Sequence, residues 1–377
     1  MCGIFGYVGT QELPRKDLDF LVRHSQIRGR DSSGLIVHTG AGYAAAKADF
    51  AITKLLQKVP LTSATVFFGH SRLITNGLGD NQPVVRDGIA VIHNGIVVNH
   101  ETLWARLGLP RHLEIDTEII PAIARNGLDG GATLEEAARR VLEECRGIVA
   151  CAMAIPELGK LVLFSNNGSL YLGNTPSGQV FASEQFPLEQ LGCHDIQQVR
   201  EPVSIDIPTE GGPIETKEWK GRRTNLIPPL VLSSTEEAIL EFPEPDLLRC
   251  SRCILPETMP FIRFDNDGVC NYCTHYRPRN QPRPKQELFD LVAPYRRARG
   301  TECIVPFSGG RDSCYALHLI VNELELRPVT YTYDWGMVTD LGRRNISRMC
   351  SELGVENIIV ADDITKKRKN IQKNLNA

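Results

Sequence analysis

Short apolar runs alternate with amphipathic segments over the first 217 residues. Continuous or alternating apolar runs predict strands, whereas apolar positions that recur every three to four residues predict helices. Because several strands follow one another with only turn residues between them, the pattern favours antiparallel sheets and an α+β domain. The predicted strands are Thr65–Leu73, Ile89–Val97, Ile148–Ile155, Lys160–Ser165 and Gln179–Ser183, and the predicted helices are Lys16–Gln26, Thr117–Asn126 and Leu134–Cys145, the last preceded by a capping box at Thr133 and Glu136.

The pattern changes twice after this domain. Residues 218–249 carry four prolines in a mostly polar background, which is typical of a linker. Residues 250–276 form a compact insert that contains four cysteines, and a second proline-rich linker spans 277–284. The chain is therefore expected to divide into residues 1–217, a linker, the insert and a final domain.

Helices and strands alternate in the final domain, residues 285–377. This alternation predicts a parallel sheet covered by helices, an α/β arrangement. Only three strands are present, where such domains usually have about five, so this domain is expected to be partial. The predicted helices are Lys285–Arg299, Asp312–Glu325, Leu341–Leu353 and a basic helix after Asp363, and the predicted strands are Glu302–Phe307, Pro328–Tyr333 and Asn357–Val360.

Composition narrows the class of protein. A length of 377 residues predicts two or three domains. The net charge of −3 argues against a general surface for polyanions, so a nucleic-acid partner is not expected. No apolar run is long enough to cross a membrane and no secretory pattern begins the chain, which predicts a cytoplasmic protein without a membrane partner.

The second residue is a cysteine, and loss of Met1 would leave Cys2 with both a thiol and a free amine. An α-amine has a pKa of about 7.7–8 and a thiol one of about 8.5. The amine can therefore accept the thiol proton, and a terminal cysteine can act as a complete nucleophile. The alternative is that Cys2 is a small apolar residue of a first strand.

Four polar segments could assist such a nucleophile: residues 28–34, 69–72, 93–95 and 116–118. Arg72 can hold a carboxylate through paired hydrogen bonds, and Asp116 can bind an ammonium group. The Asn94 side chain and the Gly95 backbone N–H are two donors that an oxyanion hole requires. The alternatives are that Arg72 forms a surface ion pair, Asn94–Gly95 a hairpin turn and Asp116 a helix N-cap.

Together these segments resemble the class II glutamine amidotransferases, which are N-terminal-nucleophile (Ntn) hydrolases. The resemblance covers residues 2–203 and rests on Cys-Gly-Ile, Arg-Gly-x-Asp-Ser-x-Gly, Gly-His-x-Arg and His-Asn-Gly. It implies a four-layer αββα sandwich, with glutamine as the substrate. By position, it implies Cys2 as the nucleophile, Asn94 and Gly95 as the oxyanion hole, and Arg72 and Asp116 as the glutamine-binding residues. His70 and His93 are interpreted as structural, because the amine of Cys2 already supplies the base.

Cysteine pairs mark the insert. Sixteen residues separate Cys250-x-x-Cys253 from Cys270-x-x-Cys273, a spacing that matches tetrahedral zinc sites. Four sulfur ligands leave no open position, so a structural Zn²⁺ is expected. A redox dithiol is the alternative, and His275 could replace one cysteine.

A glycine-rich loop follows the first strand of the final domain: Ser308, Gly309, Gly310, Arg311, Asp312 and Ser313. Glycines allow the backbone to approach phosphate oxygens, and the N–H groups of the next helix point at the anion. The loop resembles the pyrophosphate-binding loop (PP-loop) of the ATP pyrophosphatases, which implies binding of ATP with Mg²⁺. Asp312 could hold Mg²⁺ or cap the helix, Arg311 stands where lysine is common, and Asp334 lies where an α/β sheet places nucleotide contacts.

These parts predict a glutamine amidotransferase and ATP-dependent carbon–nitrogen ligase that passes ammonia from glutamine to an adenylated carbonyl. Residues 249–334 resemble the N-acetyl sugar amidotransferases of surface-polysaccharide synthesis, which implies a nucleotide-linked N-acetyl sugar as acceptor. Asparagine synthetase, a zinc PP-loop enzyme of tRNA thiolation and a non-catalytic binding module are the alternatives. A homodimer, or a partner that supplies the rest of the ATP domain, is expected.

Overall fold

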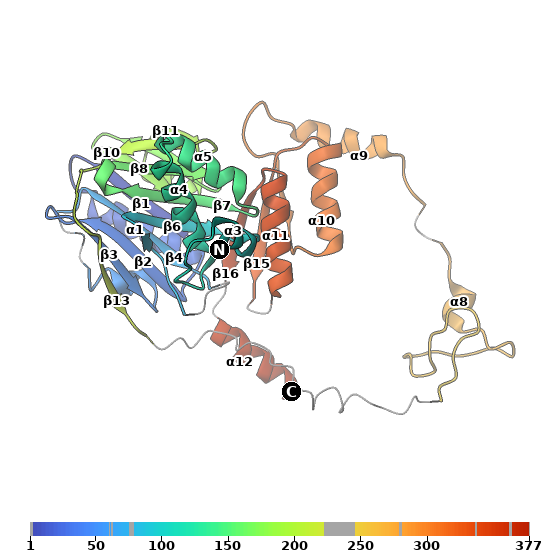
Figure 1. The fold of residues 1–377 in the computed structure, drawn as a ribbon. Coiled ribbons are helices and arrows are strands. Elements are labelled where there is room, and N and C mark those ends of the chain that lie inside the picture. Colours follow the sequence, from blue (N-terminus) through green and yellow to red (C-terminus); the bar gives the residue numbers. More distant parts are fainter. Residues whose placement is uncertain are drawn as a thin grey trace. The chain divides into compact units, whose positions relative to one another are not determined.

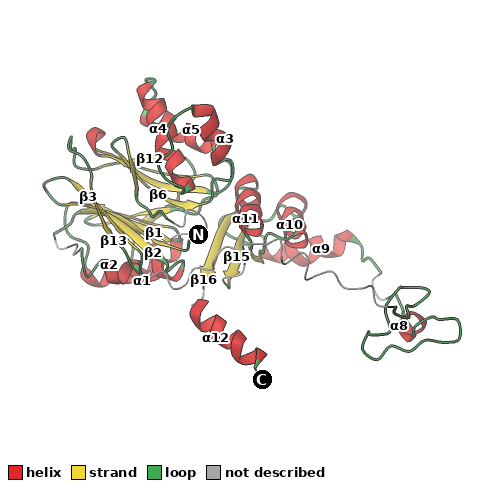
Figure 2. Ribbon diagram, turned by 60° about the horizontal axis from the view of Figure 1, so that its bottom comes forward, coloured by secondary structure: helices red, strands yellow, loops and turns green. Residues whose placement is uncertain are grey.

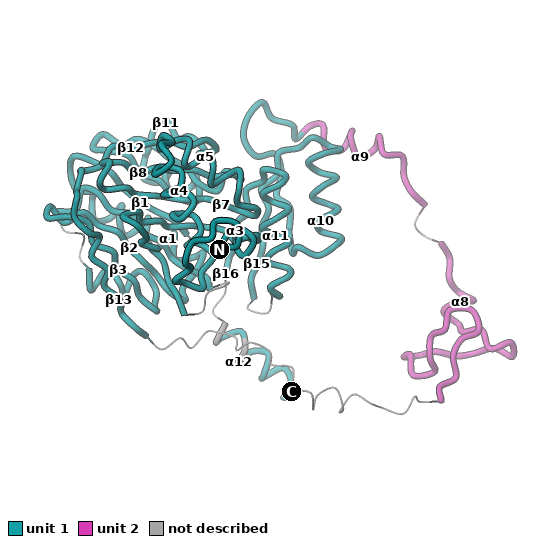
Figure 3. Tube along the Cα trace, viewed as in Figure 1, with its two compact units in different colours: residues 1–227, 295–377 teal, residues 228–294 magenta. Residues whose placement is uncertain are grey.

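A computed structural model of the chain describes residues 3–59, 61, 63–74, 79–221, 246–278, 281–335, 338–361 and 364–376. The chain divides into two compact units (Figure 1 and Figure 3). Unit 1 joins residues 1–227 to residues 295–377, and unit 2 consists of residues 228–294. The predicted N-terminal domain and residues 295–377 of the predicted final domain therefore lie in the same unit, whereas residues 285–294, predicted as the start of that domain, belong to unit 2.

The larger sheet of unit 1 has eight strands in the order β11-β9-β10-β1-β4-β2-β3-β13. Its pairs are antiparallel except for β13, which runs parallel to β3. Since β13 ends at Trp219, this sheet includes residues beyond the predicted boundary at 217. The strands are β1 (Gly3–Gly9), β2 (Ser32–His38), β3 (Tyr43–Ala48), β4 (Val66–Arg72), β9 (Tyr171–Thr175), β10 (Gly178–Ala182), β11 (His194–Gln198) and β13 (Glu215–Trp219).

The smaller antiparallel sheet has five strands in the order β12-β8-β7-β6-β5. These strands are β5 (Val84–Arg86), β6 (Ile89–Gly95), β7 (Val149–Ile155), β8 (Lys160–Ser165) and β12 (Val203–Asp206). The helices of this region are α1 (Arg15–Ile27), α2 (Ile52–Leu55), α3 (His100–Leu107), α4 (Ile119–Asp129), α5 (Leu134–Glu144) and α6 (Gln185–Gln190), with 3₁₀ turns at Asp116–Glu118 and Pro156–Leu158.

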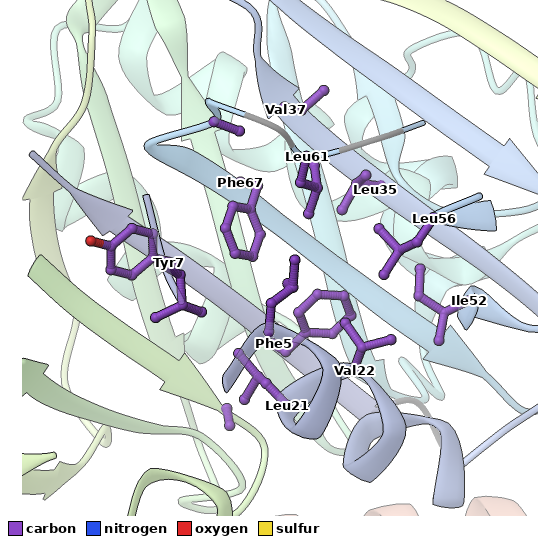
Figure 4. Close-up of a cluster of buried hydrophobic side chains, with 14 of the residues drawn as sticks. Phe5, Tyr7, Leu21, Val22, Leu35, Val37, Ile52, Leu56, Leu61 and Phe67 are labelled. Carbon is purple, nitrogen blue, oxygen red and sulfur yellow. The ribbon is translucent and has the colours of Figure 1, made fainter. Parts of the chain in front are cut away.

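Three apolar clusters show how the sheets and helices are layered (Figure 2). In the first, Phe5 and Tyr7 of β1 pack with Leu21 and Val22 of α1 on the outer face of the larger sheet (Figure 4). The second joins α4 and α5 to the outer face of the smaller sheet. The third lies between the two sheets, because alternate side chains of a strand point to opposite faces. The order is therefore helix, sheet, sheet, helix, the αββα arrangement that the resemblance implied.

A parallel three-stranded sheet, β14-β15-β16, forms the C-terminal part of unit 1. Its apolar cluster also contains Leu73 and Ile148 of the N-terminal region, so the two regions share one core. The strands are β14 (Cys303–Pro306), β15 (Pro328–Asp334) and β16 (Glu356–Ala361), and the helices are α10 (Arg311–His318), α11 (Asp340–Glu352) and α12 (Ile364–Leu375).

Unit 2 contains α8 (Asn271–His275) and α9 (Lys285–Val292). Most of the predicted linker 218–249 lies outside the described residues. Isolated bridges join Arg249 to Pro256 and Phe264 to Cys270, one beside each cysteine pair. The backbone N–H of Ser251 donates to the Gly268 oxygen at 3.0 Å, which joins the two halves of the insert.

Most predicted elements are present, and three differ. The predicted helix 285–299 ends at Val292 and continues only as a 3₁₀ turn, Ala293–Tyr295. The predicted helix 312–325 is α10 followed by a π-helical turn, Leu319–Glu323. The polar segment 28–34, for which no strand was predicted, includes the start of β2 at Ser32, where two buried serines pair with β4. The polar composition of this segment concealed a buried strand.

Candidate functional site

The predicted glutamine-site residues lie at the ends of elements from both sheets. Arg72 ends β4, Asn94 and Gly95 end β6, and Asp116 begins the 3₁₀ turn before α4. Charges on Arg72 and Asp116 both act on the pKa of His93, so these groups are near neighbours. Cys2, the predicted nucleophile, lies outside the described residues.

Arg72 is buried, with 2% of its surface exposed, which excludes the alternative of a surface ion pair. Its Nη1 donates a hydrogen bond to the backbone oxygen of Asp80. The Asp80 carboxylate in turn accepts hydrogen bonds from the backbone N–H groups of Glu114 and Ile115, the residue before Asp116. Asp80 therefore ties the arginine to the segment that carries the predicted ammonium-binding carboxylate.

Asp116 is also buried, and its side chain does not cap the helix that follows. Instead, its Oδ2 accepts a hydrogen bond from the backbone N–H of Val97 at 2.7 Å. The N-cap alternative is therefore wrong, and the carboxylate fixes the chain just after Gly95.

Asn94 and Gly95 pair with Ala150 and Val149 of β7, so they belong to a strand and not to a hairpin turn. Gly95 has a φ of +153°, and an added Cβ would lie 1.9 Å from the backbone oxygen of Ile148. Only glycine fits this position, because any side chain would meet the neighbouring backbone.

Gln82 is a residue of this region that the sequence analysis missed. Its side-chain amide accepts a hydrogen bond from the His93 N–H at 2.7 Å and donates one to the His93 oxygen at 3.0 Å. It also donates to the Thr117 hydroxyl at 3.1 Å. The signal in the sequence was weak: a polar triplet, residues 80–82, that lies immediately before a proline and a buried strand.

Both histidines of the motifs are fully buried. Burial, together with the charge of Arg72, lowers the pKa of His70 to about 3. Burial also lowers the pKa of His93, whose Nε2 lies 3.0 Å from the Ile148 oxygen and therefore donates to it. Burial that keeps both side chains neutral, with the hydrogen bond that fixes His93, fits the interpretation of these residues as structural.

Asp31 connects this site to the C-terminal region. Burial raises the pKa of Asp31, although its carboxylate accepts a hydrogen bond from the Ile74 N–H at 3.0 Å and is influenced by Arg72 and Arg343. Arg343 lies on α11, and Ile346 of the same helix shares an apolar cluster with Leu73, the residue after Arg72.

Comparison with known proteins shows what the N-terminal region of unit 1 is similar to. Residues 70–190 match the glutamine amidotransferase domain family. The chain contains a glutamine amidotransferase domain, which places a class II enzyme domain in unit 1. This domain match includes Arg72, Asn94, Gly95 and Asp116.

Curated relatives agree with the glutamine amidotransferase domain. Glutamine–fructose-6-phosphate aminotransferases (isomerizing) are 31% identical over 201 residues in Thermococcus kodakarensis and 32% over 235 residues in Thermus thermophilus. These alignments cover 50% and 57% of this chain but only 33% and 38% of the relatives. The chain thus spans little more than a third of the length of these relatives.

Two solved structures are also similar. Glutamine phosphoribosylpyrophosphate amidotransferase from B. subtilis, complexed with ADP and GMP, is 24% identical, with a TM-score of 0.45 over 56% of this chain and 50% of that one. A structure described as the allosteric regulatory enzyme of purine biosynthesis is 18% identical, with a TM-score of 0.46 over 96% of this chain and 80% of that one. At these TM-scores neither similarity carries an argument about this chain.

The predicted phosphate loop, Ser308–Ser313, connects β14 to α10, which begins at Arg311. Gly309 has a φ of +73°, and the Ser308 and Ser313 hydroxyls lie 3.1 Å apart. The loop rests on α11: Asn345 Nδ2 donates to the Gly309 oxygen at 3.2 Å. The side chains of Arg311 and Asp312 are exposed and paired with each other.

Asp334 ends β15, as predicted, and is buried. Arg343 donates two hydrogen bonds to its Oδ2, at 2.8 and 3.2 Å. This pairing holds Asp334 against α11, and a nucleotide would meet a carboxylate whose charge is already matched by an arginine.

The four cysteines of unit 2 form a compact cluster. The sulfurs of Cys250, Cys253, Cys270 and Cys273 all lie within 4.8 Å of one another. The 250–273 and 253–270 pairs are 3.9 and 3.6 Å apart, close to the ~3.8 Å edge of a tetrahedron with Zn–S bonds of about 2.3 Å. The donor set therefore fits Zn²⁺.

Backbone donors also favour thiolates in this cluster, since the N–H groups of Arg252 and Cys270 donate to Cys250 Sγ. His275 is not part of it: its Nδ1 lies 2.7 Å from the Asn271 oxygen. Across the part of the chain that the structure describes, no helix is long and apolar enough to span a bilayer.

Proposed function

We propose that this chain is a glutamine-dependent amidotransferase in which Cys2 hydrolyses glutamine to glutamate and ammonia. One observation carries the proposal. The buried side chains of Arg72 and Asp116 are linked through Asp80, and Asp116 holds the backbone at Val97, two residues after Gly95, inside the segment that matches the glutamine amidotransferase domain. A guanidinium, a carboxylate and two N–H donors in one place match the carboxylate, ammonium and carboxamide of glutamine.

In this proposal Arg72 binds the α-carboxylate of glutamine and Asp116 its ammonium, which directs the carboxamide to Cys2. The sulfur forms a bond with the carboxamide carbon while the α-amine of Cys2 takes the thiol proton. The oxyanion accepts hydrogen bonds from the Asn94 amide and the Gly95 N–H. The C–N bond then breaks, the proton passes to the departing nitrogen, and ammonia leaves. Water cleaves the thioester to give glutamate and free Cys2.

The proposed acceptor half lies in the C-terminal region. Ser308, Gly309, Gly310 and Ser313 would bind the pyrophosphate of ATP with Mg²⁺ through hydroxyl and backbone N–H groups. ATP would supply an adenylyl group to a carbonyl oxygen of the acceptor, and that oxygen would then leave with AMP when ammonia attacks the carbonyl carbon. The resemblance of residues 249–334 supports an N-acetyl sugar as the acceptor, in surface-polysaccharide synthesis.

A sugar phosphate is the second candidate acceptor. It is favoured by the curated relatives, whose names specify fructose 6-phosphate.

The four cysteines would hold a structural Zn²⁺ that joins the two pairs and stabilises unit 2.

Ammonia release from glutamine tests the proposal. Wild-type protein should hydrolyse glutamine, whereas Cys2→Ala and a protein that retains Met1 should not, because each lacks the free amine-and-thiol residue. The N-terminus of each protein is checked by intact mass, and folding by circular dichroism. Assays with ATP and with candidate nucleotide sugars or sugar phosphates then distinguish the acceptors by the formation of AMP. Appreciable ammonia release by either variant would refute the mechanism.

A further inference from the structure

Ser347 of α11 is buried, with 1% of its surface exposed, and forms two hydrogen bonds with the N-terminal domain. Its Oγ accepts from the backbone N–H of Ile148 at 2.7 Å and donates to the backbone oxygen of Ile96 at 2.8 Å. Residues 199 and 251 positions apart in the chain are thereby joined by one hydroxyl. Both backbone groups are buried and would otherwise need another partner.

Both backbone groups belong to residues close to Gly95, since Ile96 follows it in the chain and Ile148 precedes Val149, its partner on β7. The peptide unit between Ile96 and Val97 is held at both ends, by Ser347 at its oxygen and by Asp116 at its N–H. One peptide bond, Gly95–Ile96, separates this unit from Gly95, so holding it restricts the backbone rotation of the preceding residues.

Ile148 lies just before β7, next to Val149, the residue that pairs with Gly95 of β6. Its oxygen is the atom that an added Cβ at Gly95 would strike, and it accepts a hydrogen bond from His93. Its backbone N–H donates a hydrogen bond to the Ser347 hydroxyl. The strand beside Gly95 is therefore fixed by a histidine from within the domain and by a serine from outside it.

We propose that Ser347 is a positioning residue for the oxyanion hole of Asn94 and Gly95. The inference rests on the proposed function, in which the Gly95 N–H stabilises the oxyanion. Ser347 contacts neither glutamine nor the reacting atoms. It orients the backbone that carries the donor, so the glutaminase depends on one side chain of the C-terminal α/β region. A donor that is misplaced by a fraction of an ångström stabilises the transition state less, while binding of glutamine through its α-groups is unaffected.

Ser347→Ala removes both hydrogen bonds and keeps the helix, since alanine is a good helix former. We expect kcat for glutamine hydrolysis to fall about tenfold or more, because loss of a whole oxyanion donor lowers kcat by about 10²–10³-fold. KM for glutamine and the Kd for glutamate should change less than about twofold, because uniform binding is left intact. An unchanged kcat, or a rise in KM with unchanged kcat, would overturn the proposal.

Tyr171→Phe is the matched control. The Tyr171 hydroxyl donates to Glu356 Oε2 at 2.6 Å, another buried hydrogen bond between the same two regions, but not one to the end of β6 or the start of β7. This variant should retain kcat. If both variants lose kcat equally, the effect comes from general loosening between the regions, and the positioning role is wrong.

Ser347→Cys keeps the test decisive if the alanine variant does not fold. It nearly preserves the volume and replaces the hydroxyl by a weaker donor and acceptor, so kcat should fall severalfold in a protein that melts close to the wild type. A wild-type kcat in this folded variant would overturn the inference. Failure of the proposed function looks different, because the wild-type protein would then release no ammonia at all.

Discussion

Asp116→Asn tests how the domain selects glutamine. In the wild-type protein the Asp116 carboxylate accepts a hydrogen bond from the Val97 N–H at 2.7 Å. The substitution removes the negative charge but keeps an oxygen that can accept the same hydrogen bond. The backbone after Gly95 should therefore stay in place, while the proposed partner of the substrate ammonium becomes neutral.

The size of the effect follows from the burial of this carboxylate, 2% of whose residue surface is exposed. A hydrogen bond to a charged group contributes about 1.5–3 kcal/mol, and about 1.4 kcal/mol corresponds to a factor of ten. KM for glutamine should rise about 10- to 100-fold, and kcat should change by less than about threefold, because the charge binds substrate and transition state alike.

The assay compares glutamine with glutaramate, the same molecule without its α-amino group. Wild-type protein should strongly prefer glutamine in kcat/KM, and Asp116→Asn should lose most of that preference. Glu118→Gln is the matched control, since Glu118 is an equally buried acid two residues away that pairs with Arg86 at 2.7 Å. Its preference for glutamine should remain. An undiminished preference in Asp116→Asn would refute the assignment of the ammonium site.

Two further predictions concern the metal and the contact between regions. Cys250→Ser or Cys273→Ser should reduce about one Zn²⁺ per chain to a substoichiometric amount by elemental analysis; a metal-free wild-type protein would remove the zinc site. Burial raises the pKa of Glu356 to about 7, although the Tyr171 hydroxyl donates to it. Unfolding releases this proton above about pH 4.5, so stability should fall between pH 4.5 and 7. Between pH 5 and 8, the Tm of Glu356→Gln should fall less than the Tm of the wild-type protein. An equal fall in the two proteins would contradict the raised pKa of Glu356.

Local signals in the sequence predicted about half of the helices and strands that the structure describes, and short strands such as β3 and β5 were not predicted. Thr133 and Glu136 form the capping box that begins α5, because that interaction spans only three residues. The apolar runs that became β6, β7 and β8 were strong, since both faces of this sheet are covered. β2 was not predicted. One reason is that Ser32 and Ser33 are polar yet buried, and their partners on β4 lie about 40 residues away.

The candidate site divides in the same way. Arg72, Asn94, Gly95 and Asp116 were predicted because each belongs to a short motif. Gln82 and Ser347 were missed, because each acts on a backbone group that is distant in sequence, and no local pattern indicates such a partner.

The sequence by itself determined the chemistry available to this protein: a cysteine at position 2, an arginine at the end of an apolar run, glycines before a helix and two cysteine pairs. Such features depend on residue type and on spacings of a few residues. Only the tertiary structure decided that α11 of the C-terminal region contacts the backbone at Ile96, next to Gly95, and the Ser308–Ser313 loop at Gly309. The reason is physical, because buried backbone groups must find hydrogen-bond partners in space, and the packing of distant elements determines which side chain supplies them.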